Sequence, residues 1–243
     1  MTTQKFDQAT SYVKWKAWDA ENFGRFTNSD RICFEAELRA AGVSVTKDTK
    51  VLEIGFGNGK FAAWICKNSE HYVGTESNPE LVERAIGAGI EAHLGTNDLT
   101  EVALHRRFDL IVAFDVLEHL DMPDILTLLE SAKRCLSDNG RIVFRVPSGD
   151  SPFSGPLMYG DITHKTRLGS KAIAQIATIT GLEVVSTHDA VLPIYGMGLI
   201  VAIESILVNI FRKFVGAIIR AAFNGNKHAV ISSNMVAVLR CRG

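Results

Sequence analysis

The run Val51-Leu52-Glu53-Ile54-Gly55-Phe56-Gly57-Asn58-Gly59-Lys60 decides the fold of this chain. It begins as a short apolar strand with an acidic residue, continues as a turn rich in glycine, and leads into a helix that we expect to open at about Gly59. Glycines carry no Cβ, so the backbone can turn sharply off the strand and approach a ligand closely. A strand, a glycine turn and a helix in this order predict an α/β domain with a ligand at the turn.

The spacing of the glycines separates classes of α/β protein. The dinucleotide fingerprint Gly-x-Gly-x-x-Gly requires a small residue at position 60, where this chain has Lys60. The pattern here is Glu53-x-Gly55-x-Gly57-x-Gly59, and no P-loop Lys-Ser/Thr pair follows it. The spacing therefore disfavours a nicotinamide oxidoreductase.

The composition fits one α/β domain with additions, because 243 residues are enough for a full core. A net charge of −1 gives no electrostatic case for nucleic acid, and the Asn/Asp-Pro-Pro-aromatic tetrapeptide that serves a flipped base is absent. The polar start, Met1 to Asp7, lacks the apolar core of a signal peptide, so we expect a cytoplasmic protein. The cysteines stand far apart, which argues against a zinc site. They are Cys33, Cys66, Cys135 and Cys241.

Strands and helices alternate after a helical start, in which a helix at 29–41 is expected with Ser29 or Asp30 as its cap. Apolar runs predict strands at 51–54, 71–76, 91–94, 108–114 and 141–146, and the helix before the last of these is expected to end at Asp138-Asn139-Gly140. Strict alternation predicts a parallel, doubly wound sheet with its ligand crevice at the carboxyl strand ends. Three acidic residues fall at such ends, namely Glu53, Glu76 and Asp115.

The glycine pattern and its companions resemble class I S-adenosylmethionine (SAM)-dependent methyltransferases. The resemblance implies a Rossmann-like, seven-stranded sheet with five parallel strands, a sixth strand at 182–188 and an antiparallel last strand beside the fifth. It divides the single domain into a helical cap at 1–48, a SAM-binding core at 49–195, an apolar helical insertion at 196–226 and the last strand at 227–243.

SAM, with S-adenosylhomocysteine as product, is the cofactor that the resemblance implies. Glu76 is expected to accept hydrogen bonds from two ribose hydroxyls, the alternative being a surface helix cap ahead of Pro79. The adenine contact stays open among Thr96, Asn97 and Asp98. The expected cofactor-binding residues are Glu53, Gly55, Phe56, Gly57, Gly59, Glu76, Ser77, Thr96, Asn97, Asp98, Asp115 and Val116.

The segment from Asp115 to Leu120 is similar to one that lines the methionine end of the cofactor in the quinone- and polysaccharide-modifying branch of this superfamily. Asp115 and Val116 are carried over as SAM neighbours. The roles of Glu118 and His119 do not follow from the resemblance, and hydrogen bonds to loops beneath the site would explain them equally well.

A long loop, Ser148 to Leu168, follows the fifth strand at the face where substrate residues are expected. Its run Gly160-Asp161-Ile162-Thr163-His164 resembles a segment of bacterial methyltransferases associated with cell-surface polysaccharide clusters. Methyl transfer is an in-line displacement, so the protein must align the nucleophile and remove its proton. We expect His164 to be that base, with Asp161 orienting it or binding a sugar hydroxyl. The alternative is that both residues only pin the loop.

Residues Met197 to Phe223 are unusually apolar. On one helix, the polar residues would fall within a wedge of roughly 100°. These residues are Ser205, Asn209, Arg212, Lys213 and Arg220. The charges disfavour a membrane span. The remaining interpretations are a lid packed on the domain, a homodimer interface or a helix that touches a membrane surface, and we favour core or dimer packing.

Together these patterns predict a SAM-dependent O-methyltransferase acting on a sugar or glycan precursor in polysaccharide biosynthesis. A quinone- or other small-molecule methyltransferase is the alternative among enzymes, and a SAM-binding protein without catalysis is the alternative from another class. No metal-ligand constellation is visible along the sequence, so no metal is predicted.

Overall fold

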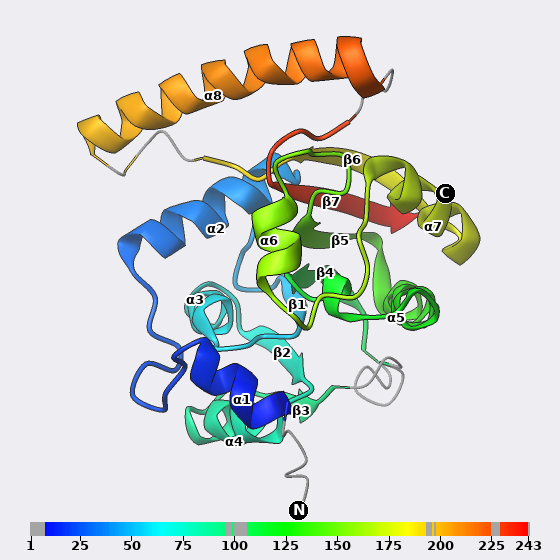
Figure 1. Ribbon diagram of the computed structural model, residues 1–243. Coiled ribbons are helices and arrows are strands. Elements are labelled where there is room, and N and C mark those ends of the chain that lie inside the picture. Colours follow the sequence, from blue (N-terminus) through cyan, green and yellow to red (C-terminus); the bar gives the residue numbers. More distant parts are fainter. Residues whose placement is uncertain are drawn as a thin grey trace, which may run out of the picture.

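The computed structural model describes residues 8–95, 99, 106–192, 196, 198–224 and 229–242. Its strands are β1 (Lys50–Ile54), β2 (His71–Glu76), β3 (Ala92–Leu94), β4 (Phe108–Phe114), β5 (Leu136–Pro147), β6 (Leu182–Asp189) and β7 (Asn234–Cys241). They form one seven-stranded sheet in the order β3-β2-β1-β4-β5-β7-β6 (Figure 1). β7 runs antiparallel to β5 and β6, and the other pairs are parallel. The predicted Rossmann-like sheet with an antiparallel last strand is confirmed.

Helices cover both faces of this sheet. They are α1 (Gln8–Trp15), α2 (Asn28–Ala40), α3 (Lys60–Asn68), α4 (Pro79–Gly87), α5 (Met122–Cys135), α6 (Gly155–Gly160), α7 (Ser170–Thr180) and α8 (Leu199–Ile219), with short turns of helix at Leu117–His119 and Arg220–Asn224. One apolar core joins the sheet to α5 and α7, and the other joins it to α2, α3 and α4. Ile111 and Ala113 of β4 belong to the first core, and Leu110 and Val112 to the second. The alternation of side chains along a strand therefore builds both layers.

Two expected boundaries are wrong. The N-cap of α2 is Thr27 rather than Ser29 or Asp30, because Thr27 Oγ1 accepts from the Asp30 N–H at 3.1 Å while the Asp30 carboxylate accepts from the Thr27 N–H at 2.8 Å. This is a capping box, in which Asp30 stands three residues inside the helix.

The run Asp138-Asn139-Gly140 lies inside β5 and does not end α5. Phe108 pairs with Leu136 and Leu110 with Arg141, so residues 137–140 form a bulge between two paired positions. A turn-forming sequence serves equally well for such a bulge, because the extra residues leave the ladder there.

The apolar insertion forms α8, which lies across one end of the molecule at the top of Figure 1. Ser205 of the polar wedge is buried, whereas large apolar side chains of the same helix are exposed, among them Ile200, Phe211 and Phe214. Packing of the apolar side into the core is therefore wrong as an interpretation. Among the described residues, no helix is long and apolar enough to cross a membrane. The proposed division of the chain at 48, 195 and 226 stays a prediction.

Candidate active site

A cavity of about 840 Å³ opens at the carboxyl ends of β1, β2 and β4. The glycine turn after β1, Glu76 at the end of β2 and Asp115 after β4 all line it. Tyr12 and Trp18 of the N-terminal segment, together with residues of α2, complete the wall. The strand ends that the sequence singled out thus meet at one crevice, as a doubly wound sheet requires.

The glycine turn is shaped by its close neighbours. At Gly55 the backbone φ is +71°, and a Cβ would lie 2.5 Å from Cγ2 of Val116. At Gly57, φ is +54°, and a Cβ would lie 2.9 Å from the Trp18 ring. Both positions therefore require glycine, for the left-handed backbone and for space. The turn leaves a cradle along the cavity that side chains would fill.

Glu76 is held in place by backbone donors. Its Oε2 accepts from the Gly57 N–H at 3.0 Å, and its Oε1 accepts from the N–H groups of Ser77 and Asn78 at 2.7 and 3.0 Å. The cap of α4 is Asn78, whose side chain accepts from the Glu80 N–H at 2.9 Å. The alternative of Glu76 as a helix cap is therefore not needed. Its carboxylate lines the cavity and has acceptor capacity left for hydroxyl groups.

Two further polar groups lie on the wall of the cavity near the glycine turn. Glu53 is buried and accepts from the Tyr72 hydroxyl at 2.8 Å, and burial raises its pKa to about 8, so it is protonated at neutral pH. Asn58 donates to the Asn22 carbonyl, but its buried Oδ1 has no hydrogen-bond partner among the described residues. An unpartnered acceptor suits a ligand that carries an ammonium or hydroxyl group, and SAM carries both. The cradle, Glu76 and Asn58 together fit SAM.

The predicted adenine contacts lie outside the described residues, since Thr96, Asn97 and Asp98 belong to that part of the chain. Gly95 before them lines the cavity, and its N–H donates to the Glu76 carbonyl at 2.6 Å. The adenine contact stays a prediction.

Asp115 sits in a left-handed backbone conformation, with φ of +58°. The Arg145 guanidinium donates to both of its carboxylate oxygens, Nε to Oδ1 at 2.9 Å and an Nη to Oδ2. Backbone strain of this kind gathers at functional sites. Through these hydrogen bonds Arg145 is paired with Asp115. Lys165 is paired with Asp121 at 3.3 Å, so each of these two cations already has an acidic partner.

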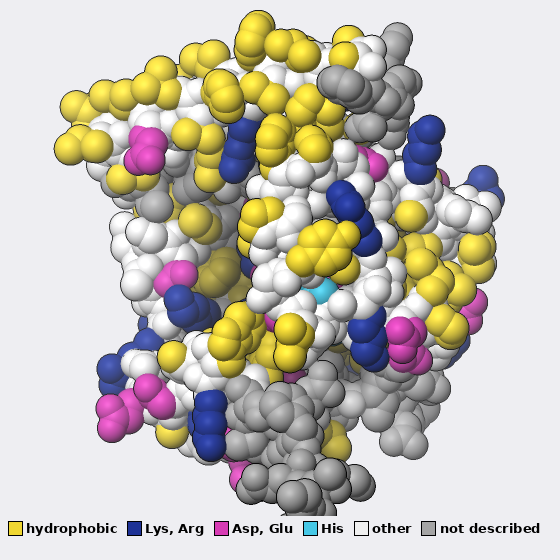
Figure 2. Space-filling view, viewed as in Figure 1, with side chains coloured by type: hydrophobic (Ala, Val, Ile, Leu, Met, Phe, Trp, Pro, Cys, Tyr) yellow, Lys and Arg dark blue, Asp and Glu magenta, His cyan; other side chains and the backbone are white. Residues whose placement is uncertain are grey.

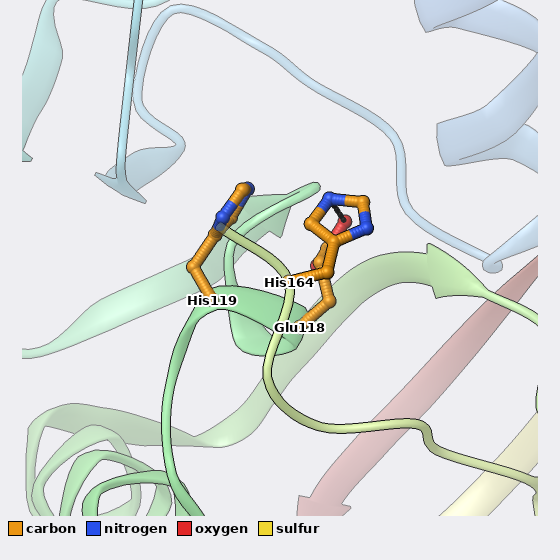
Figure 3. Close-up of side chains that lie close together, drawn as sticks. All are labelled: Glu118, His119 and His164. Atoms are coloured by element: carbon orange, nitrogen blue, oxygen red, sulfur yellow. Dashed lines mark ion pairs between the residues drawn. The ribbon is translucent and has the colours of Figure 1, made fainter. Parts of the chain in front are cut away.

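Two imidazoles stand together at the wall of the cavity, with ring centroids 4.7 Å apart (Figure 3). His119 lines the cavity. His164, on which the sequence placed the base, is 9% exposed in its side chain and does not line it. The sequence left the role of His119 open, because neither periodicity nor spacing tells which of two imidazoles faces a ligand.

A chain of hydrogen bonds fixes the tautomer of His119. Thr163 Oγ1 donates to Asp161 Oδ1 at 2.6 Å, since an ionised carboxylate only accepts. Thr163 Oγ1 lies 2.8 Å from His119 Nδ1, and its single proton is already used, so His119 Nδ1 donates and Nε2 keeps its lone pair. Burial and the neighbouring His164 lower the pKa of His119, which keeps the ring neutral at pH 7. Burial alone would raise the pKa of Asp161, but the Thr163 hydrogen bonds and the imidazoles hold it below its ordinary value.

His164 faces two carboxyl groups. Its Nδ1 donates to the Met158 carbonyl at 3.1 Å, and its Nε2 lies 4.0 Å from Glu118 Oε1 and 3.9 Å from Asp161 Oδ2. Burial raises the pKa of Glu118 to about 8. Glu118, His119 and His164 can direct ligand atoms to within 4.8 Å of one another, so they are the described residues best placed to hold a metal ion. No spacing along the sequence indicates this group, because the fold joins two distant segments.

The strand order, the antiparallel β7 and the glycine crevice define the class I fold of SAM-dependent methyltransferases. Residues 23–187 match the family model of the methyltransferase domain, and the chain belongs to this family. It is a SAM-dependent methyltransferase. A search of curated proteins found no match.

Solved structures agree with the fold. A SAM-dependent methyltransferase from Archaeoglobus fulgidus is 15% identical with a TM-score of 0.61, covering 96% of this chain and 99% of that chain. A methyltransferase from Haloferax volcanii, in complex with the activator Trm112, is 17% identical with a TM-score of 0.62, covering 96% and 98%. A complex of DhpI with SAM and HEP is 13% identical with a TM-score of 0.57, covering 99% and 100%. At such identities the likeness shows the fold alone.

Proposed function

We propose that this methyltransferase transfers a methyl group to a hydroxyl of a sugar or glycan precursor, and that an imidazole on the cavity removes the hydroxyl proton. Bound SAM would supply an electrophilic methyl group. The chain then has to orient the acceptor hydroxyl and accept its proton. Polysaccharide biosynthesis is the setting that the resemblance of the 160–164 segment suggests.

The observation that carries the proposal is the chain from Asp161 through Thr163 to His119. It fixes the proton of the imidazole on Nδ1 and leaves Nε2 as a base on a cavity-lining ring, while burial and His164 lower the pKa of that ring. A base oriented through its second nitrogen by a carboxylate is a recurring arrangement in acid–base catalysis. The Thr163 hydroxyl links the Asp161 carboxylate to the His119 ring through two hydrogen bonds.

His164, the base expected from the sequence, takes a different part in this proposal. Its ring is almost enclosed, and its T-shaped contact supports the His119 ring from behind. We propose that it positions His119, and that Glu118, protonated at neutral pH, completes the same support. The experiment below decides between the two imidazoles.

A hydroxylated acceptor is supported by Glu37 at the α2 side of the cavity. Glu37 is buried, and its Oε2 accepts from the Val191 N–H at 3.0 Å. Its Oε1 lies 3.8 Å from His188 Nδ1, beyond hydrogen-bond distance, and has no hydrogen-bond partner among the described residues. A sugar hydroxyl would supply the missing donor. Phe34, Phe61 and Phe114 line the cavity too, and this apolar wall favours a quinol as the second candidate acceptor.

The test compares methyl transfer by His119→Asn and His164→Asn with the wild type, using nucleotide-sugars and quinols as acceptors. We expect His119→Asn to lower kcat about a hundredfold or more, and His164→Asn to lower it by roughly tenfold or less. Calorimetric titration with S-adenosylhomocysteine should give equal affinities in all three proteins.

The opposite order of the two variants would return the base to His164. Near-wild-type turnover in both would refute an imidazole base. Tight S-adenosylhomocysteine binding without transfer to any acceptor would favour the third possibility, a SAM-binding protein without catalysis.

A further inference from the structure

The polar side of α8 faces the domain. Ser205 and Gly216 are its buried residues, and Asn209 and Arg212 beside them are half-buried. The Arg220 guanidinium at the helix end donates to the Ala229 carbonyl at 3.3 Å. A surface helix of a water-soluble domain has the opposite arrangement, with its apolar stripe on the core.

The outer side of α8 is a continuous apolar face. Its large side chains are all more than a third exposed, from 37% at Val201 to 82% at Ile200. They are Leu199, Ile200, Val201, Ile203, Leu207, Phe211, Phe214 and Ile218. In the space-filling view they form the apolar ridge along the top of the molecule (Figure 2). Exposed apolar surface of this extent marks an interaction site.

The shape of this face suits a lipid surface. It runs along a single helix of 21 residues, about 32 Å long, that lies across one end of the molecule (Figure 1). A helix lying in the headgroup region needs no matching partner surface, because acyl chains adapt to its side chains.

One cation of α8 is placed to meet an anionic surface. Arg212 is half-buried on the side toward the domain, whereas Lys213 is exposed, as is the one acid of the helix, Glu204. Lys213 is exposed and stands at the border between the polar and apolar sides. A lysine in this place can lay its stem along the apolar face and reach lipid headgroups with its ammonium.

A second cavity connects this helix with the active site. It measures about 420 Å³ and lies between α8, at Ile206, Asn209, Ile210 and Lys213, and the segment 190–192. Ala190 and Val191 of that segment also line the catalytic cavity. The two cavities are therefore separated only by the thickness of this short segment.

We infer that α8 lies on an anionic bilayer, and that the acceptor is a membrane amphiphile whose hydroxylated head reaches the catalytic cavity past Ala190 and Val191. The docking itself rests on α8 alone, whereas the identity of the acceptor rests on the proposed function. The apolar tail of the amphiphile would stay in the bilayer or beneath α8.

The experiment is flotation of the full chain with vesicles of phosphatidylcholine, with and without phosphatidylglycerol. The test variant is Leu207→Glu/Phe211→Glu/Phe214→Glu on the outer face of α8. The matched control is Ile86→Glu/Ile179→Glu, because these two side chains are 58% and 56% exposed on α4 and α7. We expect the wild type and the control to float with anionic vesicles, and the test variant to lose at least about tenfold in partitioning. Lys213→Glu should remove the preference for phosphatidylglycerol.

Wild-type protein that does not float, or a test variant that floats as well as the control, overturns the docking. The face belongs to a second copy if the wild type does not float and is dimeric by light scattering while the test variant is monomeric. This result also overturns the docking on a bilayer. Calorimetry with S-adenosylhomocysteine confirms that each variant is folded. Methyl transfer that is equally fast to soluble and to vesicle-borne acceptors, with flotation intact, overturns the membrane acceptor but not the docking. If the wild type floats but transfers methyl groups to none of the acceptors, the proposed function is refuted and the docking is not.

Discussion

Replacing Gly55 by alanine tests how the glycine turn is built. A Cβ at this residue meets two separate costs. The left-handed backbone, with φ of +71°, costs an L-residue roughly 1–2 kcal/mol. The contact at 2.5 Å with Val116 Cγ2 adds overpacking of roughly 1–3 kcal/mol. We therefore expect Gly55→Ala to lower the free energy of unfolding by about 2–5 kcal/mol.

Urea denaturation of five proteins, the wild type and four variants, separates these costs. Gly42→Ala is the matched control, because its φ is also +71° and a Cβ there would meet nothing within 4 Å, so it should lose only about 1–2 kcal/mol. In a Val116→Ala background the clash is gone, and the double-mutant cycle should give a coupling of about 1–3 kcal/mol. A Gly55→Ala loss no larger than that of Gly42→Ala, or a coupling near zero, would refute the reasoning.

Three further predictions concern acidic residues and a helix cap. Glu76→Ala should weaken S-adenosylhomocysteine binding about ten- to a hundredfold by calorimetry, while Glu80→Ala on the exposed side of α4 leaves it unchanged; equal affinities would contradict the ribose role. Because the pKa of Glu53 is raised to about 8, the folded state keeps a proton that the unfolded state releases near pH 4.5, so its contribution to stability falls as pH rises through this window and is level above it. In urea titrations at several pH values, the unfolding free energy of Glu53→Gln should lack this decrease with rising pH. The same decrease in the variant and the wild type would speak against a raised pKa of Glu53. Thr27→Ala should cost about 1 kcal/mol of unfolding free energy and Ser29→Ala less than about 0.5, and the capping box is mistaken if the two lose equally.

The sheet could be predicted because each strand carries its own signal. The run 108–114 forms β4 with the same bounds. It is mostly apolar on both faces, because a strand between two helical layers is buried on both sides. The site at the strand ends followed from topology, because parallel strands bring their carboxyl ends to one edge.

Other features depend on contacts that no local pattern contains. His119 and His164 come from segments far apart in the chain, and only the packed loop decides which ring lines the cavity. The polar wedge of α8 was correctly placed on one side, but a helical period gives two faces without saying which one meets the domain. Thr27 was missed because Ser29 and Asp30 are also good capping residues, and only the hydrogen bonds choose among them.

The place of β7 in the sheet has a consequence for the order of events during synthesis. β6 lies at the sheet edge, and its neighbour there is β7, whose core residues from Met235 to Leu239 are fully buried. α8 is made between these strands. At translation rates of about 5–20 residues per second, the stretch from Asp189 to Cys241 takes roughly three to ten seconds. For the last one to four seconds of that time, roughly, the nascent chain carries an unpaired strand and a complete α8 together, so the helix can meet another surface before the sheet is closed.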